Sequence, residues 1–304
     1  MRQVYISGEM VPESEAKISI FDSAVMLGDT VTESTRTFRH QPFKLDQHIT
    51  RMYKSLKVTR IDPGCSPDEM KEITSGVVEA NLPEVAEEDD IWIVHNISRG
   101  VSMPGPDPTV QQGRATVMIH TAPMDLTGWA GFYEKGCHAV TSMSRIIPSQ
   151  SLDARIKNRS RMAYTLAEVE VKLVDPLAQG IILDVHGNVA ENKGGNIFAV
   201  TDGRLRTPKS QNSLAGVSRE TVLELAEGLG IENEATELQP YDLYTADELF
   251  FTSTPYCIMP ATKFNGLPVG SGEVGELTRA LLDAWSDQVG MDIVKQARDQ
   301  MRQT

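Results

Sequence analysis

The sequence is poor in cysteine and has no long hydrophobic run. Its three cysteines, at positions 65, 137 and 257, are widely spaced and include no CxxC pair. An odd, scattered set of thiols argues against a disulfide framework and suits a reducing cytoplasm. No stretch approaches the roughly 20 apolar residues of a membrane span, and the polar N-terminal stretch has no apolar core of signal-peptide length. We therefore expect a cytoplasmic protein with no membrane partner.

Positive charge is also scarce. The chain has 29 Lys and Arg against 42 Asp and Glu, which gives a net charge of −13 and a pI of about 5.0. An acidic chain argues against nucleic acid or an anionic membrane as its main partner. The six histidines form no HExxH motif and no metal-like pair, so we predict that the protein holds no metal.

What is present is ordinary globular composition, with 304 residues of which 40% are hydrophobic and 23% charged. This length suffices for one large or two medium domains. The most informative stretch is 155–200, which begins with Lys157. Asp175-Pro176 ends a predicted helix after it, because the residue before a proline leaves helical space. The apolar stripe of that helix consists of Met162, Leu166, Val169 and Leu173.

A predicted hairpin completes this stretch. Residues 180–185 are typical of a buried strand, residues 185–188 of a turn, and Glu191 belongs to the start of the next strand. Gly194-Gly195 then lets the backbone come close to another group. Taken alone, Lys157 would be a solvated surface charge and Glu191 a surface acid near a turn.

The frame of these residues resembles the core of the class IV, fold-type IV aminotransferases, which include the branched-chain and D-amino acid aminotransferases. Glu191 follows Lys157 by 34 residues (191 − 157), and the run 195–198 has the sequence GNIF. The resemblance implies that Lys157 carries pyridoxal 5'-phosphate as a Schiff base and that Glu191 pairs with the pyridine nitrogen. A Schiff base needs an amine that can also move protons. An adjacent carboxylate keeps the ring nitrogen protonated, which makes the ring an electron sink.

A predicted helix at 47–57 has the sequence QHITRMYKSLK, which resembles the family's H-x-x-R-[LM] helix. The resemblance implies that Arg51 holds the cofactor phosphate. The guanidinium fork suits this role because it makes paired charge-assisted bonds to phosphate oxygens. Without the resemblance, Arg51 would be a solvated arginine, because it lies off the apolar face of the helix.

Two later segments also resemble phosphate-binding positions. AGVSRE is similar to the family's G-[IV]-[TS]-R-[DE], which implies that Val217 and Ser218 bind phosphate. The hydroxyls of Ser253 and Thr254 match the family's strand followed by a [GS]-T loop. A helix N-terminus after a glycine suits an anion in any case. The plainer alternatives are an N-cap at Ser218 and an ordinary turn at 252–255.

Substrate contacts follow from two further resemblances. LGDTVTESTRTF resembles the strand that borders the substrate pocket in the family, with Arg36 where the branched-chain enzymes also carry arginine. Thr32 replaces an aromatic residue and Leu27 a tyrosine, so we expect a less apolar or differently shaped pocket. Without the resemblance, this polar stretch would be a plain edge strand. Pro255-Tyr256 falls where the family receives the substrate carboxylate on backbone amides, which makes Tyr256 a substrate candidate.

Two departures limit what carries over. The loop 100–113 has no arginine, whereas the D-amino acid enzymes trap the substrate carboxylate with an arginine there. The branched-chain enzymes place a tyrosine five residues after the lysine, where this chain has Met162, with Tyr164 two residues further on. The role of that tyrosine is therefore not assigned.

The resemblance covers nearly the whole chain and implies an α/β (α+β) fold, the two-domain fold of fold-type IV, with the cofactor between the domains. We expect a small N-terminal α/β domain at 1–122, an interdomain connection at 123–129 and a large C-terminal domain carrying Lys157 at 130–304. The family is dimeric, so we also expect a homodimer.

The predicted reaction is transfer of an amino group from an L-branched-chain amino acid to 2-oxoglutarate, with pyridoxal 5'-phosphate as cofactor. One alternative is a D-amino acid or (R)-amine aminotransferase of the same fold. Another is aminodeoxychorismate lyase, which eliminates pyruvate and is separated by product analysis. A cofactor-binding protein without activity is the last, although the presence of both Lys157 and Glu191 argues against it and a turnover assay would decide.

Overall fold

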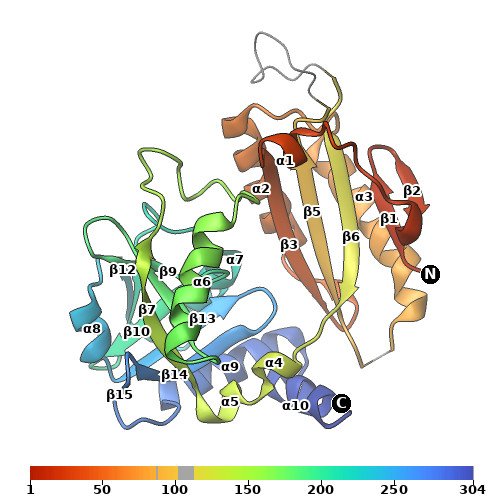
Figure 1. Cartoon of the computed structure of the whole chain (residues 1–304). Coiled ribbons are helices and arrows are strands. Elements are labelled where there is room, and N and C mark those ends of the chain that lie inside the picture. The colour runs from red at the N-terminus through yellow and green to blue at the C-terminus, as the bar shows by residue number, and fades with distance from the viewer. Residues whose placement is uncertain (87, 102–112, 304) are drawn as a thin grey trace. The chain divides into compact units, whose positions relative to one another are not determined.

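A computed structural model describes residues 1–86, 88–101 and 113–303. The chain forms two compact units, coloured from red to blue along the sequence in Figure 1. Unit 1 consists of Met1–Met124 and Ile156–Ser160, and unit 2 of Asp125–Arg155 and Arg161–Thr304. The segment that contains Lys157 therefore groups with unit 1. The domain bounds expected from the sequence stay a prediction.

Unit 1 is built on an antiparallel sheet. Its described strands follow the order β2-β1-β6-β5-β3-β4, and each neighbouring pair is antiparallel. Ile91, Ile93 and Ile97 are buried and lie two and four residues apart along β5, so their side chains share one face of the strand. The bounds are Gln3–Ile6 (β1), Glu9–Pro12 (β2), Thr30–Phe38 (β3), Gln41–Pro42 (β4), Ile91–Ser98 (β5) and Thr116–Pro123 (β6).

Helices α2 and α3 cover one face of this sheet (Figure 1). On α2, the buried side chains of Ile49, Met52 and Leu56 recur at helical spacing and pack into the core of unit 1. The helix predicted at 47–57 is thereby confirmed. The bounds are Leu45–Thr59 (α2) and Pro67–Asn81 (α3), with single turns at Glu13–Glu15 (η1), Ser23–Met26 (α1) and Leu82–Glu84 (η2).

Unit 2 contains a mixed sheet whose described strands follow the order β12-β11-β10-β13-β14-β7-β8-β9, with β15 paired to β14. The pairs β11/β12, β14/β7 and β7/β8 are parallel. The predicted hairpin is confirmed, since β8 and β9 pair antiparallel. The bounds are Cys137–Arg145 (β7), Gln179–Leu183 (β8), Val189–Glu191 (β9), Asn196–Thr201 (β10), Arg204–Pro208 (β11), Asn233–Thr236 (β12), Glu248–Ser253 (β13), Cys257–Phe264 (β14) and Leu267–Pro268 (β15).

Aromatic side chains fill the core of unit 2. The rings of Phe198 on β10 and Phe250 on β13 stack with centroids 5.0 Å apart, and Trp285 of α9 is buried.

Among the described helices, none combines the length and the hydropathy needed to cross a membrane. The bounds are Thr127–Ala130 (α4), Phe132–Lys135 (α5), Met162–Val174 (α6), Val217–Gly228 (α7), Pro240–Tyr244 (α8), Glu276–Val289 (α9) and Ile293–Gln303 (α10).

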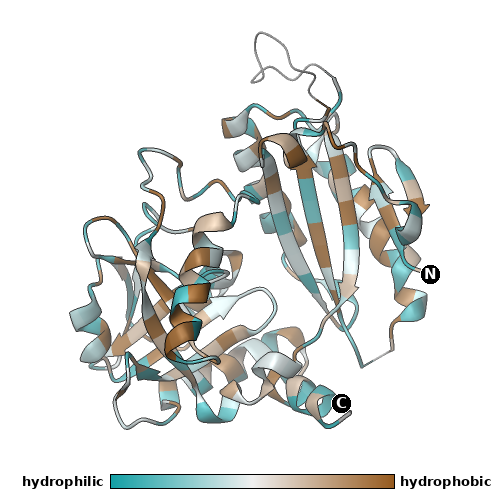
Figure 2. Ribbon diagram, in the orientation of Figure 1, coloured by the Kyte–Doolittle hydropathy of each residue, from teal (hydrophilic) through white to brown (hydrophobic). Residues whose placement is uncertain are grey.

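The helix predicted after Lys157 is confirmed as α6, but its apolar stripe is exposed in the single chain. The exposed fractions along the stripe are 75% for Met162, 54% for Leu166, 54% for Val169 and 84% for Leu173. Ala167 and Val171 face the interior instead. Figure 2 shows strongly hydrophobic turns along α6. The helix thus packs on unit 2 through small and β-branched residues and leaves its larger apolar side chains to solvent.

Candidate functional site

Lys157 is fixed by its backbone in unit 1. Its N–H donates to Ser55 Oγ on α2 at 3.2 Å, and its carbonyl accepts from the N–H of Thr32 on β3 at 2.9 Å. An antiparallel bridge between Asn158 and Val31 continues this pairing. The residue predicted to carry the cofactor is therefore held between a helix and a strand, although it lies in a connecting segment.

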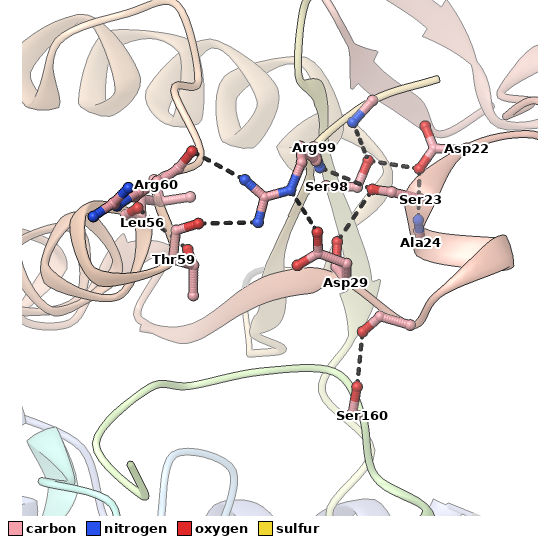
Figure 3. A network of polar contacts seen from close by, with 12 residues as sticks. Asp22, Ser23, Ala24, Asp29, Leu56, Thr59, Arg60, Ser98, Arg99 and Ser160 are labelled. Atoms are coloured by element: carbon pink, nitrogen blue, oxygen red, sulfur yellow. Dashed lines mark hydrogen bonds and ion pairs between the residues drawn. The ribbon is translucent and has the colours of Figure 1, made fainter. Parts of the chain in front are cut away.

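A polar network fixes the start of β3 and the segment beside it (Figure 3). Arg99 donates from Nε to Asp29 Oδ2 at 2.7 Å and from both terminal nitrogens to two carbonyls at the C-terminal end of α2, at 3.1 and 2.9 Å. Ser160 Oγ donates to the carbonyl of Gly28 at 2.7 Å. Arg99 thus joins the C-terminal end of α2 to the residue before β3, and Ser160 joins the 156–160 segment to the same region.

Arg51 lies in a buried cluster of charged groups in unit 1. Its Nε and Nη2 donate to the two oxygens of Glu33 at 2.8 and 2.6 Å, and Glu33 is fully buried. His48 Nδ1 lies 3.1 Å from Glu33 Oε1. Two parallel bonds to one carboxylate hold the guanidinium in a defined plane. Such an arginine is oriented before any ligand arrives.

The electrostatics of this cluster follow from burial and charge. Burial raises the pKa of Glu33, but the charge of Arg51 and the contacts with His48 outweigh it and hold that pKa well below its usual range. Burial lowers the pKa of His48, and although Glu33 opposes this, the positive charges of Arg51 and Lys157 add to the lowering. Lys157 is therefore close enough to this cluster for its charge to be felt there.

Glu191 ends β9 in unit 2 and is 5% exposed. Its Oε1 accepts from the hydroxyl of Tyr164 at 2.6 Å, and its Oε2 accepts from the N–H of Leu214 at 2.8 Å. Both donors are neutral, and hydrogen bonds of this kind orient a carboxylate without cancelling its charge. Glu191 is thus a fixed acid, unlike the surface acid that the sequence would suggest by itself.

Tyr164 is the site residue that sequence reasoning missed. Its ring packs against the small cluster around Ile182 and Ala190, and the Arg161 guanidinium lies 3.7 Å from the ring centroid. Burial, followed by the neighbouring charge of Glu191, raises the pKa of the Tyr164 hydroxyl. Helical spacing did not reveal it, because the apolar stripe of α6 is exposed and Tyr164 lies three residues before buried Ala167, on the face that periodicity did not mark.

The N-terminus of α7 carries Val217 and Ser218 as its first two residues. Gly216, in an extended conformation, is the N-cap, and no side chain caps the helix, so the alternative of an N-cap at Ser218 is wrong. A Cβ at position 216 would overlap Oδ1 of Asn196, which explains why a glycine precedes the helix. An uncapped helix N-terminus presents backbone N–H groups to an anion.

The third predicted phosphate segment lies at the end of β13. Ser253 donates from Oγ to the carbonyl of Gly194 at 2.6 Å, and Thr254 follows in the turn to β14. Tyr256 is 5% exposed, and its carbonyl accepts from the hydroxyl of Tyr133 at 2.9 Å. Ser253 thereby joins the Gly194-Gly195 turn to this strand end.

The predicted substrate residues Arg36 and Thr32 are buried within unit 1. Arg36 is 1% exposed, donates from Nε to the carbonyl of Thr37 at 3.0 Å and pairs with Asp90 at 3.4 Å. Thr32 donates from Oγ1 to the carbonyl of His95 at 2.9 Å. Substrate contact by these two residues stays a prediction, and the contacts seen do not favour it for Arg36.

Two expectations concern absences. Among the residues that the structure describes, no group of three or more His, Cys, Asp and Glu side chains is arranged to hold a metal ion. The arginine-free loop expected at 100–113 lies largely outside the described residues, since 102–112 are not described.

Comparison with known proteins adds three findings. Residues 30–264 match the model of the family described as amino-transferase class IV. A curated relative, the putative branched-chain-amino-acid aminotransferase of Methanocaldococcus jannaschii, is 33% identical over 94% of this chain and 96% of its own. The fold is similar to that of the branched-chain amino acid aminotransferase of Escherichia coli, with a TM-score of 0.87, 28% identity and coverage of 94% of both chains.

A second solved structure bears on the ligand. The branched-chain amino acid aminotransferase of T.th., complexed with N-(5'-phosphopyridoxyl)-L-glutamate, has a TM-score of 0.84 and is 26% identical to this chain, covering 95% of this chain and 94% of its own. The α/β fold expected from the sequence is confirmed by these likenesses.

Proposed function

Because the chain belongs to the class IV aminotransferase family, whose members use pyridoxal 5'-phosphate, we propose that it moves an amino group between an L-branched-chain amino acid and 2-oxoglutarate. The names of its relatives support this donor class. They do not favour a D-amino acid or (R)-amine aminotransferase, or a lyase. The substrates are then small amino acids and keto acids.

The two hydrogen bonds that orient Glu191 are the observation that carries the proposal. When bound, pyridoxal 5'-phosphate supplies an electron sink for the electrons released at the substrate Cα. A protonated ring nitrogen is required for this, and a nearby carboxylate favours it. Glu191 is buried with both oxygens oriented, by Tyr164 and by the N–H of Leu214. An acid held in this way fits the ring nitrogen.

Lys157 is the proposed catalytic residue. Its amine would hold the cofactor covalently and, once the substrate amine has replaced it, the free amine would move the proton at the substrate Cα. The backbone bonds to Ser55 and Thr32 support this role, because they fix the Cα from which the side chain extends. A flexible side chain on a fixed backbone can serve both tasks.

The proposed phosphate ligands are Arg51, Val217, Ser218, Ser253 and Thr254. The fit rests on two features of the chain. Glu33 orients the guanidinium of Arg51, and Gly216 leaves the first turn of α7 without a Cβ or a side-chain cap. Arg51 supplies a planar cation, and the first turn of α7 supplies backbone N–H donors. A guanidinium and backbone N–H groups are the two usual partners of a phosphate.

Thr32 and Tyr256 are proposed to line the substrate side, with Tyr256 next to the proposed phosphate hydroxyls in sequence. We do not extend this proposal to Arg36, because Asp90 and Thr37 already engage its guanidinium.

We also propose a cytoplasmic homodimer. The exposed stripe of α6, formed by Met162, Leu166, Val169 and Leu173, supports a second copy as the partner that covers it. The three cysteines are free thiols, which supports a reducing compartment. Sedimentation of Leu166→Glu should yield monomer, and a variant that stays dimeric would assign the contact to another face.

The deciding experiment uses Lys157→Ala with Lys172→Ala as its control. Lys172 lies on α6, half exposed and paired with Glu168 at 2.9 Å. Wild type and the control should give a borohydride-fixed lysine–cofactor adduct and full turnover. Lys157→Ala should lose the adduct and nearly all activity. An adduct that persists in Lys157→Ala would overturn the assignment.

Substrate choice needs a separate panel. L-leucine, L-isoleucine and L-valine should each act as donors to 2-oxoglutarate, and D-alanine and (R)-1-phenylethylamine should not. Activity confined to the D-amino acid or the amine would overturn the branched-chain assignment and leave amino transfer standing.

A further inference from the structure

Asn196 contacts two of the segments of unit 2 that lead to proposed cofactor ligands. It is 4% exposed and begins β10. Its backbone pairs in register with Thr252 on β13, directly before Ser253 and Thr254. Its side chain points instead to the chain that leads into α7, where Nδ2 donates to the carbonyl of Leu214 at 2.9 Å.

Leu214 connects this side chain to the acid. Its carbonyl accepts from Asn196, and its own N–H donates to Glu191 Oε2 at 2.8 Å. Leu214 is therefore held at its carbonyl by Asn196 and at its N–H by Glu191. A displacement of Leu214 would move a donor of Glu191, so the position of the acid depends on the Asn196 amide.

The amide oxygen of Asn196 lies close to Gly216. A Cβ at that position would overlap Asn196 Oδ1, so only a glycine lets the chain pass this close. Gly216 directly precedes α7 and is followed by the proposed phosphate residues Val217 and Ser218. The amide oxygen thus limits how closely the chain before α7 can approach β10.

We propose that Asn196 is a positioning residue that fixes the spacing between Glu191 and the N-terminus of α7. This inference rests on the proposed function, in which the acid meets the ring nitrogen and the helix end meets the phosphate. The cofactor ring and its phosphate are joined by a short arm, so both ends bind well only when the protein groups are correctly spaced. A primary amide suits the position because it offers a donor to Leu214 and an oxygen toward Gly216.

The test compares binding of pyridoxal 5'-phosphate with binding of pyridoxal, which lacks the phosphate, to the full-length apoprotein by absorbance titration. Asn196→Ala should bind pyridoxal 5'-phosphate at least roughly tenfold more weakly, about one step of 1.4 kcal/mol. Pyridoxal should lose less affinity, because it does not use the helix end. The ratio of the two affinities should therefore fall, which a general loss of stability would not cause.

Asn81→Ala is the matched control. Asn81 is 3% exposed in unit 1, and its Nδ2 donates to the carbonyls of Gln3 and Val77 at 2.9 and 2.7 Å. It should lower stability and keep the wild-type affinity ratio. Asn196→Asp, which keeps the shape and removes the donor, should lower the ratio and carries the test if Asn196→Ala does not fold.

A double substitution tests the contact with Gly216. Gly216→Ala should weaken pyridoxal 5'-phosphate binding strongly in the wild-type background and only slightly in Asn196→Ala, because the overlapping oxygen is gone. Equal losses in both backgrounds, or an unchanged affinity ratio in Asn196→Ala and Asn196→Asp, would overturn the inference. A wild-type protein that binds neither compound would overturn the proposed function itself.

Discussion

Two buried glutamates, one in each unit, are held in different ways. In unit 1, Glu33 meets the guanidinium of Arg51 through two short bonds and also contacts His48. In unit 2, Glu191 accepts from a phenol hydroxyl, that of Tyr164, and from a backbone N–H. An ion pair neutralises a carboxylate, whereas neutral donors orient it and leave its charge available.

This difference separates two tasks. Glu33 orients a cation, so its effect on a ligand passes through Arg51. Glu191 is oriented as an anion, so it can act directly on a positively charged partner such as a protonated ring nitrogen. Under the proposed function, the same residue type serves in unit 1 as support for a ligand-binding arginine and in unit 2 as the binding group itself.

The largest expected effect comes from breaking the ion pair of unit 1. Arg51→Ala leaves Glu33 buried and uncompensated, which should cost about 3–5 kcal/mol of stability, and should also weaken binding of pyridoxal 5'-phosphate. Arg36→Ala is the matched control, since it breaks the buried pair with Asp90. It should lower stability comparably and leave cofactor affinity near wild type. Chemical denaturation and cofactor titration measure the two effects.

The comparison of these arginines can fail in two ways. Unchanged cofactor affinity in Arg51→Ala would reduce Arg51 to a structural partner of Glu33. A selective rise in the KM for 2-oxoglutarate in Arg36→Ala would return Arg36 to the substrate side.

Removing the charge of Glu191 is expected to have the next largest effect. Glu191→Gln keeps the shape of the side chain but no longer favours a protonated ring nitrogen, so turnover should fall on the order of a hundredfold, equivalent to about two pKa units. Glu170→Gln is the matched control, because Glu170 of α6 also accepts from neutral donors, the N–H and hydroxyl of Ser144, at 2.8 and 2.6 Å. Steady-state rates that fall equally in both variants would contradict the role of Glu191.

Local patterns predicted much of this fold and part of the site. The spacing of Ile49, Met52 and Leu56 gave the right helix, and the turn residues 185–188 gave the right hairpin. Short-range signals of this kind depend on neighbours in sequence. Arg51 was selected by the resemblance of its helix to the family's motif, and its pairing with Glu33 was not predicted, because it depends on how α2 packs on β3.

Other features depend on tertiary contacts that no local pattern encodes. The apolar stripe of α6 predicted the helix correctly but not that the stripe would be exposed, since periodicity does not say which partner covers a face. Serine is a common N-cap residue, yet α7 begins before Ser218, at Val217, directly after the glycine that lies close to Asn196. The donor Tyr164 was missed because its role depends on the packing of α6 beside β9.

The donor on the other side of Glu191 provides a smaller test. Tyr164→Phe removes one hydrogen bond to a charged group, which should lower turnover about tenfold. The loss should vanish in a Glu191→Gln background if the hydroxyl acts through that acid. Tyr53→Phe, which removes a hydroxyl bonded to the Cys65 carbonyl at 2.8 Å in unit 1, is the control. A full additional loss in the double variant would mean that Tyr164 acts independently of Glu191.

The last prediction concerns the pH dependence of unit 1. Burial lowers the pKa of His95 to about 4. Its Nε2 lies 2.8 Å from Thr74 Oγ1, whose own hydrogen is donated to Met70, so the imidazole is a neutral donor. The unfolded chain takes up a proton below about pH 6.5 and the fold does not, so His95 favours folding fully above that pH. Its contribution falls by about 1.4 kcal/mol per pH unit as the pH drops toward about 4.

Hydrogen exchange, corrected for its intrinsic pH dependence, measures this effect in each unit separately. Protection of β3 and β5 should fall between pH 6.5 and 4, and His95→Gln, which preserves a donor to Thr74, should reduce that fall. Protection of β10 and β13 in unit 2 should change less over the same range, because the buried His95 lies in unit 1. Equal losses in the two sheets would contradict the assignment of this pH dependence to His95.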